Sequence, residues 1–109
     1  MHELALAESI VTTVCERAAG RPVHRITVRI GALTAVLPEA MRFCFELASS
    51  GTEAEGAVLD IAAEPATVRC RSCGAEEEIT DLILLCDCGS ADVAVTAGRE
   101  LRIVSMEVG

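Results

Sequence analysis

Aromatic residues are almost missing from this sequence, which contains no Trp, no Tyr and only two Phe, Phe43 and Phe45. Hydrophobic residues nevertheless make up 51% of its 109 residues. The core must therefore be aliphatic and built from Val, Ile, Leu and Ala. The chain also lacks the aromatic platform on which nucleobases stack in proteins that bind single-stranded nucleic acid.

Basic residues are scarce as well: 9 Lys and Arg stand against 17 Asp and Glu, which gives a formal charge of −8. On average, such a surface repels the phosphates of nucleic acids and of acidic membranes. No apolar run approaches the roughly 20 residues that a helix needs to cross a bilayer. We therefore predict no nucleic-acid partner and no association with membranes.

The amino terminus reads Met-His-Glu-Leu-Ala and lacks the basic start and the apolar core of a secretory signal peptide. We therefore predict a cytoplasmic protein. The signatures of common enzymes are also missing, since there is no Ser/His/Asp set and no phosphate-binding Gly loop. His24 is the only histidine besides His2. We do not expect an enzyme.

Two amphipathic helices are predicted. Apolar residues recur at three- and four-residue steps over residues 3–19, the spacing of one helical face, and a Gly-Arg-Pro sequence ends the pattern. A second helix begins near Pro38, because Pro fits the first helical turn and the Glu after it fits the positive end of the helix dipole. This helix ends before Gly51.

Three strands complete the expected domain, over residues 25–30, 57–63 and 99–108. In the last strand the apolar positions change parity, which suggests a β-bulge near Ile103-Val104. The element order predicts an α+β fold with two helices on a three-stranded sheet and an inserted four-cysteine zinc module between the last two strands. The strand order does not follow from the pattern.

The chain is therefore expected to have two parts. Residues 1–66 and 96–109 form a discontinuous α+β domain, and residues 67–95 form the cysteine module. Four of the six cysteines crowd into this module. Cys15 and Cys44 instead lie on the apolar faces of the predicted helices, where they are interpreted as small buried residues.

The module contains Cys70-x2-Cys73, twelve further residues, and Cys86-x-Cys88. In a chain without an export signal, such a cluster indicates a metal site rather than disulfides. Four thiolates satisfy the tetrahedral preference of Zn²⁺ and leave no open position, so a structural zinc ion is predicted. Iron on the same four ligands, surface disulfides and free thiols are the alternatives.

Two other classes of zinc protein share this kind of site. A Cys-x-Cys and a Cys-x-x-Cys pair can hold a zinc ion that oxidation ejects, so a redox-switched zinc protein is the main alternative. A zinc-ribbon nucleic-acid binder fits less well. Between Cys70 and Cys88 the sequence has five acidic residues against Arg71 alone, whereas such a protein needs a basic stripe.

The amino terminus has a specific chelating ability. The α-amine of Met1, the backbone nitrogen of His2 and the Nδ1 of its imidazole can close two chelate rings on one ion. Glu3 can add a backbone nitrogen or its carboxylate as the fourth ligand. Nitrogen-rich donor sets of this kind favour Ni²⁺ and Cu²⁺. Without further evidence, however, a terminal histidine is more often solvated and idle.

The whole sequence resembles the HypA family of hydrogenase maturation factors. The resemblance is carried by the opening Met-His-Glu-Leu, by the two cysteine pairs and by short stretches in the same order along the chain, namely residues 28–33, 38–40, 43–47, 51–52, 55–57 and 98–101. It implies a nickel metallochaperone that delivers Ni²⁺ for [NiFe]-hydrogenase maturation. It also implies two partners, a HypB-type GTPase and the hydrogenase large subunit.

By position, the resemblance implies that Ni²⁺ binds at His2, with Met1 and Glu3 beside it. It also implies structural Zn²⁺ on the four module cysteines, Cys70, Cys73, Cys86 and Cys88. One departure concerns the second cysteine pair, which in the family is usually Cys-Pro-x-Cys-Gly. Here it is Cys-Asp-Cys-Gly at residues 86–89. All four thiols remain, but the second turn must be tighter and the geometry of the zinc site is expected to differ.

Overall fold

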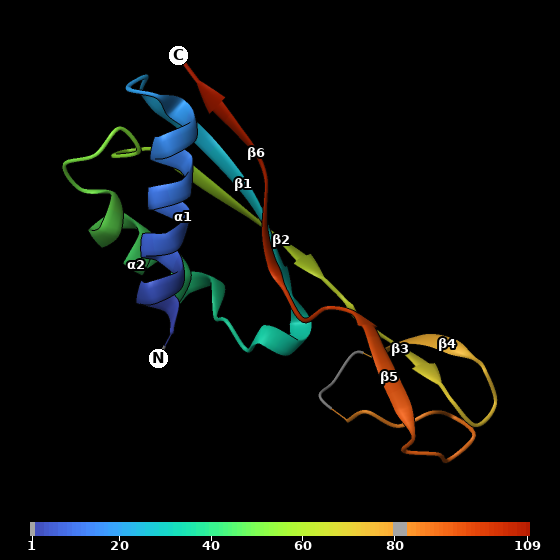
Figure 1. The fold of residues 1–109 in the computed structure, drawn as a ribbon. Helices are drawn as coiled ribbons and strands as arrows, with labels where there is room; N and C mark the ends of the chain where they lie inside the picture. The colour runs from blue at the N-terminus through green and yellow to red at the C-terminus, as the bar shows by residue number, and fades with distance from the viewer. Residues whose placement is uncertain (1, 80–82) are drawn as a thin grey trace. The chain divides into compact units, whose positions relative to one another are not determined.

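The computed structural model describes residues 2–79 and 83–109. In this part of the chain there are two α-helices, a short 3₁₀ helix and six strands (Figure 1). They divide into two compact units, and each is described by itself. The first contains the residues up to Arg29 together with Val36–Ala62 and Arg102–Gly109, and the second contains Ile30–Ala35 and Ala63–Leu101.

Helix α1 (Glu3–Ala18) is the first predicted helix. Its buried face repeats every three to four residues and consists of Ala7, Ile10, Val11, Val14 and Ala18. The helix ends where Ala19 takes a left-handed conformation with φ 53° and donates its N–H to the Cys15 carbonyl. The sequence pattern therefore predicted both the helix and its end correctly.

Helix α2 (Pro38–Ser49) is the second predicted helix and has Pro38 in its first turn. Met41 and Phe45 lie on its buried face, and α2 packs against α1. Phe43 and Leu47, one helical turn apart, are 62% and 57% exposed. Helix α2 therefore presents an apolar pair to solvent in addition to its buried face.

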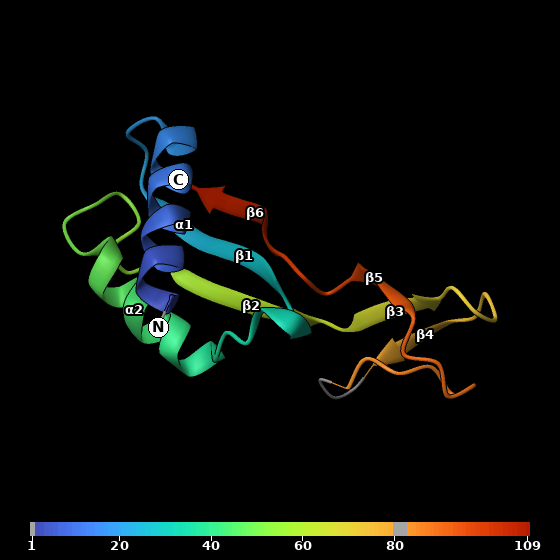
Figure 2. The ribbon, with the colours of Figure 1, turned by 60° about the horizontal axis from the view of Figure 1, so that its bottom comes forward.

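Strands β1 (Val23–Gly31), β2 (Val58–Glu64) and β6 (Leu101–Val108) form the predicted three-stranded sheet, in the order β2-β1-β6. Alternate residues of the central strand are buried, as expected for a strand with one face against helices. Both ribbon views show α1 and α2 on the same side of this sheet (Figures 1 and 2). The predicted α+β fold is therefore confirmed.

Strand β6 shows the change of parity predicted from its sequence. Leu101 and Ile103 are half-buried, but the next half-buried residues are Met106 and Val108, and Val104 is exposed. The buried side therefore shifts by one residue between Ile103 and Met106. The bulge itself stays a prediction.

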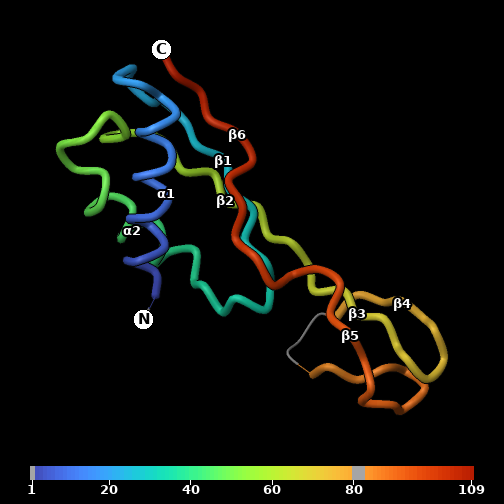
Figure 3. Tube along the Cα trace, in the orientation of Figure 1, coloured from blue at the N-terminus to red at the C-terminus, as the bar shows by residue number. Residues whose placement is uncertain are grey.

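The second unit contains a further sheet. Strand β3 (Ala66–Cys70) pairs in antiparallel fashion with β4 (Glu76–Ile79) and β5 (Val93–Ala97), in the order β4-β3-β5. The tube trace shows that these strands follow β2 and precede β6 (Figure 3). No strand is predicted from the sequence between residues 67 and 95, so this sheet corrects that prediction.

A small aliphatic core holds this sheet together. Ala66, Val68 and Ile79 are buried, and Leu33 packs against them together with half-buried side chains of β5. Leu33 lies in the 3₁₀ helix Ala32–Thr34 and donates its N–H to the Gly98 carbonyl at 2.8 Å. The segment that precedes α2 therefore contributes a side chain to the unit that holds the cysteines.

Two glycines let three backbone segments of the second unit approach closely. A Cβ at Gly31 would overlap the Gly98 carbonyl group, and a Cβ at Gly98 would lie 2.6 Å from the Ala66 Cα. Gly98 also has φ +96°, which L side chains rarely adopt.

Of the helices in the described residues, none is long and apolar enough to cross a membrane.

Candidate metal centre

The four cysteines of the second unit come together on two tight turns. Cys70 ends β3 and Cys73 follows in the turn toward β4, whereas Cys86 and Cys88 lie on a second turn that precedes β5. All four sulfur atoms lie within 4.8 Å of one another. Across the two turns, the Cys70 and Cys88 sulfurs are 3.7 Å apart, and the Cys73 and Cys86 sulfurs are 3.6 Å apart.

These distances fit a tetrahedral zinc site. Four sulfurs at about 2.3 Å from one Zn²⁺ stand about 3.8 Å from each other, close to the separations across the turns. Among the described residues, the group consists of cysteines alone. Its donor set is therefore that of a closed structural site, without the open position that a catalytic zinc ion needs.

Backbone N–H groups point at the sulfurs within each turn. The Cys73 N–H donates to the Cys70 sulfur at 3.4 Å, and the Cys88 N–H donates to the Cys86 sulfur at 3.5 Å. Each turn is closed by a glycine with positive φ, Gly74 at 79° and Gly89 at 92°. Hydrogen bonds of this kind orient metal-binding thiolates and stabilise their charge.

The two buried thiols differ in their readiness to bind a cation. Hydrogen bonds from the Cys73 and Ser72 N–H groups and from neighbouring thiols outweigh burial and lower the pKa of Cys70 to about 6. At Cys86 the Cys88 N–H also lowers the pKa, but burial and the neighbouring thiols raise it to about 12. Cys70 is therefore a thiolate at neutral pH, whereas a metal must displace the proton of Cys86.

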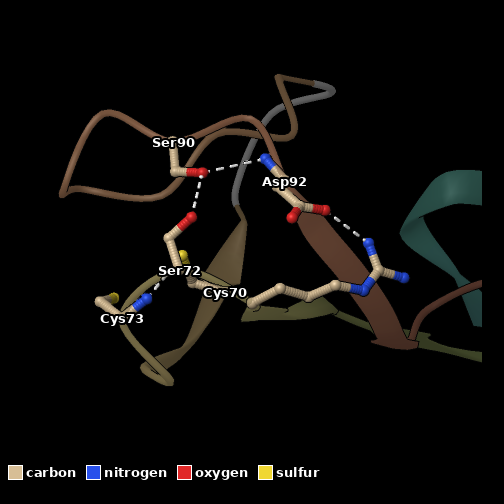
Figure 4. Close-up of polar contacts among 6 residues, drawn as sticks. Cys70, Ser72, Cys73, Ser90 and Asp92 are labelled. Atoms are coloured by element: carbon tan, nitrogen blue, oxygen red, sulfur yellow. Dashed lines mark hydrogen bonds and ion pairs between the residues drawn. The ribbon is translucent and has the colours of Figure 1, made fainter.

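Polar side chains outside the sulfur group link the two turns (Figure 4). The Ser72 and Ser90 hydroxyls are 2.9 Å apart, and the Ser90 hydroxyl oxygen accepts the Asp92 N–H at 3.1 Å. Arg71 donates from its guanidinium to the Asp92 carboxylate at 2.8 Å and from its backbone N–H to the Asp92 carbonyl at 2.9 Å. We call these four residues the turn clamp. It joins the first cysteine turn to the segment after the second.

The shortened second turn keeps both of its thiols in the sulfur group. Asp87 is its only spacer residue, and the Asp87 N–H donates to the Glu77 carboxylate of β4 at 3.1 Å. The Gly89 N–H donates to the Cys86 carbonyl at 2.8 Å, which closes the turn. The loss of a proline and one spacer residue is thus compatible with a complete four-thiol group.

The amino-terminal residues belong to the first unit. His2 is exposed and precedes α1, and its carbonyl accepts the Leu6 N–H at 2.9 Å. Glu3 is only 6% exposed. Its own N–H and the Leu37 N–H at the start of α2 hydrogen-bond to its carboxylate and lower its pKa. The Glu3 carboxylate is therefore engaged by backbone groups, whereas the His2 imidazole is accessible. Met1 lies outside the described residues.

A family model described as "Hydrogenase/urease nickel incorporation, metallochaperone, hypA" matches residues 1–108. This chain belongs to the HypA family. The family description is that of a metallochaperone rather than of a catalyst. The resemblance seen in the sequence is therefore confirmed over nearly the whole chain.

Individual HypA proteins are similar along their full length. The hydrogenase maturation factor HypA of Nostoc sp. is 45% identical over 108 residues, covering 99% of this chain and 96% of that protein. The HypA of Trichormus variabilis is 44% identical with the same coverage. The solution structure of the Ni metallochaperone HypA from Helicobacter pylori matches with a TM-score of 0.70 and 28% identity, covering 99% of this chain and 97% of that one.

In this member of the HypA family, the four predicted zinc ligands are brought together, and His2 and Glu3 adjoin at the start of α1. The turn clamp was not predicted from the sequence. Ser72, Ser90 and Asp92 belong to residue types that are common in turns, and nothing in their spacing distinguishes them. Their pairing follows only from the fold that places the two turns side by side.

Proposed function

We propose that this chain is a nickel metallochaperone that delivers Ni²⁺ for the maturation of [NiFe]-hydrogenase. The single observation that carries this proposal is the family match over residues 1–108. The exposed His2 at the amino terminus supports it, because an imidazole that must pass on its metal has to be reachable by the recipient.

Nickel is the cargo, and we propose that Met1, His2 and Glu3 bind it. The His2 imidazole must be neutral to bind, so protons compete with the metal. The Glu3 carboxylate accepts hydrogen bonds from the Glu3 N–H and the Leu37 N–H, so Ni²⁺ would displace part of this hydrogen bonding whether it takes the backbone nitrogen or the carboxylate of Glu3. The carboxylate serves to hold the terminus against the start of α2. The proposed nickel-binding domain comprises residues 1–66 and 96–109.

The resident cofactor of the proposed zinc-binding module, residues 67–95, is a structural Zn²⁺. Cys70, Cys73, Cys86 and Cys88 would hold it, because their sulfurs lie within 4.8 Å of one another and the two pairs across the turns, at 3.7 and 3.6 Å, match the separation in a tetrahedral site. When bound, the ion supplies no reaction but cross-links the two turns. The backbone N–H donors and the turn clamp keep the thiols oriented toward it.

The proposed partners are a HypB-type GTPase and the hydrogenase large subunit, which meet the chain in the cytoplasm. Ni²⁺ can be transferred to a recipient protein only if the metal ligands of that protein reach His2. We therefore place both contacts on the first unit.

Nickel titration of the zinc-loaded protein tests the proposal. His2→Ala should lower the nickel affinity at least a hundredfold, because it removes a whole chelate ring, while the zinc content and the fold stay unchanged. His24→Ala is the matched control, since this exposed histidine lies in β1 and should leave the affinity unaltered. Equal nickel affinity in both variants would move the nickel site away from the terminus.

A redox-switched zinc protein is the second candidate, favoured by the short sulfur separations across the turns. Two molecules of hydrogen peroxide would oxidise the four thiolates to two disulfides, Cys70 to Cys88 and Cys73 to Cys86; each peroxide would take up two protons and be reduced to two waters, and the ion would be released. Rapid zinc release by dilute peroxide, together with a nickel affinity unaffected by His2→Ala, would favour this function over nickel delivery.

A further inference from the structure

A groove lies beside the metal centre, within the second unit. Its described lining residues are Glu77, Glu78 and Ile79 of β4 together with Ile83, Leu85, Cys86, Asp87 and Gly89 from the segment that follows. Its volume is about 510 Å³, the size of pockets that hold small molecules or a few peptide side chains. Neither His2 nor Glu3 is among the described residues that line it.

The groove exposes apolar side chains. Ile83 is 65% exposed and Leu85 is 44% exposed, and Leu84 between them is exposed as well. The core of this unit is built from few residues. Three consecutive large aliphatic residues, 83–85, are nevertheless exposed at the surface of the unit. A run of this kind is characteristic of a surface that another chain covers.

The rim of the groove is acidic. Glu77, Glu78 and Asp87 are among its lining residues, and none of the lining residues that the structure describes is basic. The Glu77 carboxylate accepts the Asp87 N–H at 3.1 Å, which fixes one acidic group in place across the groove. The nearby Arg71 pairs with Asp92 in the turn clamp. The groove therefore offers negative charge to a basic partner.

The wall formed by β4 is also an edge of its sheet, because the strand order is β4-β3-β5. An edge strand can accept a further extended segment through its backbone groups. In such a segment, alternate side chains point to the same side. One set can then enter the apolar groove while the other set meets the acidic rim.

We propose that this groove binds an extended segment of a partner protein in which aliphatic side chains alternate with Lys or Arg. Charge complementarity favours a basic partner over a second copy of this chain, which itself carries a net charge of −8. The inference does not depend on nickel binding at the terminus. It gives the cysteine unit a recognition role in addition to its structural one.

The test uses the full-length, zinc-loaded, ¹⁵N-labelled protein and a terminally capped peptide of sequence Lys-Leu-Lys-Val-Lys. The amide resonances of residues 77–79 and 83–89 should shift on titration, whereas those of α1 and α2 should not. Two control peptides separate the contributions, Glu-Leu-Glu-Val-Glu for charge and Lys-Ser-Lys-Ser-Lys for the aliphatic side chains. Each should bind at least tenfold more weakly.

Variants of the protein make the test specific to the groove. Ile83→Asp and Glu78→Lys should each weaken peptide binding at least tenfold while the zinc content stays that of the wild type. Leu47→Asp changes an equally exposed aliphatic residue on α2 and should have no effect. Ile83 and Glu78 come from different segments of the groove. If one of the two variants loses zinc, the other still tests the proposal.

Several outcomes would overturn the proposal. Equal binding of all three peptides would show non-specific association, and shifts confined to the first unit would place the peptide elsewhere. Concentration-dependent self-association that Ile83→Asp abolishes would assign the groove to a second copy of the chain.

Discussion

The side-chain hydroxyls of Ser72 and Ser90 connect the two cysteine turns. Their hydroxyls are 2.9 Å apart, and Ser90 also accepts the Asp92 N–H. Because the second turn is shortened, fewer of its own backbone groups can form hydrogen bonds within it. Its conformation therefore depends more on hydrogen bonds to the first turn. The two serines therefore stabilise the metal site by holding the two cysteine turns in fixed positions relative to each other.

Ser90→Ala is expected to speed the loss of zinc to a chelator about fivefold, because a hydrogen bond contributes about 1 kcal/mol. The release rate can be followed with a chromogenic zinc chelator. Ser105→Ala, at an exposed serine of β6, is the control and should release zinc at the wild-type rate. Identical rates in all three proteins would mean that the hydroxyl pair does not hold the turns.

The unequal pKa values of Cys70 and Cys86 predict how many protons zinc displaces. At about pH 7.5, Cys70 with its pKa of about 6 is already a thiolate, whereas Cys86 with its pKa of about 12 still carries its proton. Zinc binding should therefore release fewer than four protons at this pH. As the pH falls through about 6, Cys70 takes up a proton, so the number released should rise and the affinity should fall.

Calorimetric titrations with zinc in two buffers of different ionisation enthalpy give the number of protons released. Cys70→Ser removes the thiol that is ionised first, so the increase near pH 6 should disappear in this variant. A proton count that stays constant from about pH 8 to about pH 5.5 would contradict the assigned order of ionisation.

The strands of the second unit depend on a close crossing of backbones at Gly98. Gly98→Ala is expected to cost about 2–4 kcal/mol in the free energy of unfolding, because it combines a positive φ with a Cβ placed 2.6 Å from the Ala66 Cα. Denaturant unfolding of the zinc-loaded protein measures this loss.

Gly56→Ala provides a matched control for the crossing. Gly56 has a similar φ of +80°, but a Cβ there would meet nothing within 4 Å. The control should therefore lose only about 1 kcal/mol, the conformational cost alone. Equal losses in the two variants would show that the crossing adds no steric constraint.

Helix α2 connects the amino terminus to an exposed apolar surface. The N–H of Leu37, the residue just before α2, hydrogen-bonds to the Glu3 carboxylate beside His2. Phe43 and Leu47 are exposed further along the same helix. A partner that covers these two side chains would contact the helix that follows the Glu3–Leu37 hydrogen bond.

If the proposed HypB-type GTPase is a partner, the chain is expected to contact it through the first unit and not through the cysteine unit. Phe43→Glu should weaken binding of a HypB-type GTPase at least tenfold, because it places a charge in an apolar contact. Ile83→Asp, an equally exposed change in the cysteine unit, should leave it unaltered. Surface plasmon resonance with the full-length proteins measures both, and the opposite ranking would transfer the contact to the cysteine unit.

Local sequence patterns were sufficient for the helices, for the three strands of the first sheet and for the identity of the cysteine group, but not for the order of the strands. Apolar spacing fixed α1 and α2 to within a residue or two, since helix periodicity and end signals are encoded locally. The strands of the cysteine unit were not predicted. The sequence of β4, Glu-Glu-Glu-Ile, has the composition of a solvated loop and forms a strand only because β3 lies beside it.

The sequence alone determined which residue types are available for metal binding, four thiols in one segment and a histidine at the second position. These are properties of composition and spacing, and together with the short matching stretches they were enough to indicate the HypA family. Only the tertiary structure decided how far the sulfurs lie from one another, that Ser72 meets Ser90, and that backbone N–H groups engage the Glu3 carboxylate. Each of these features involves residues that lie far apart in the sequence and meet only when the segments between them fold. No local sequence pattern could therefore specify them.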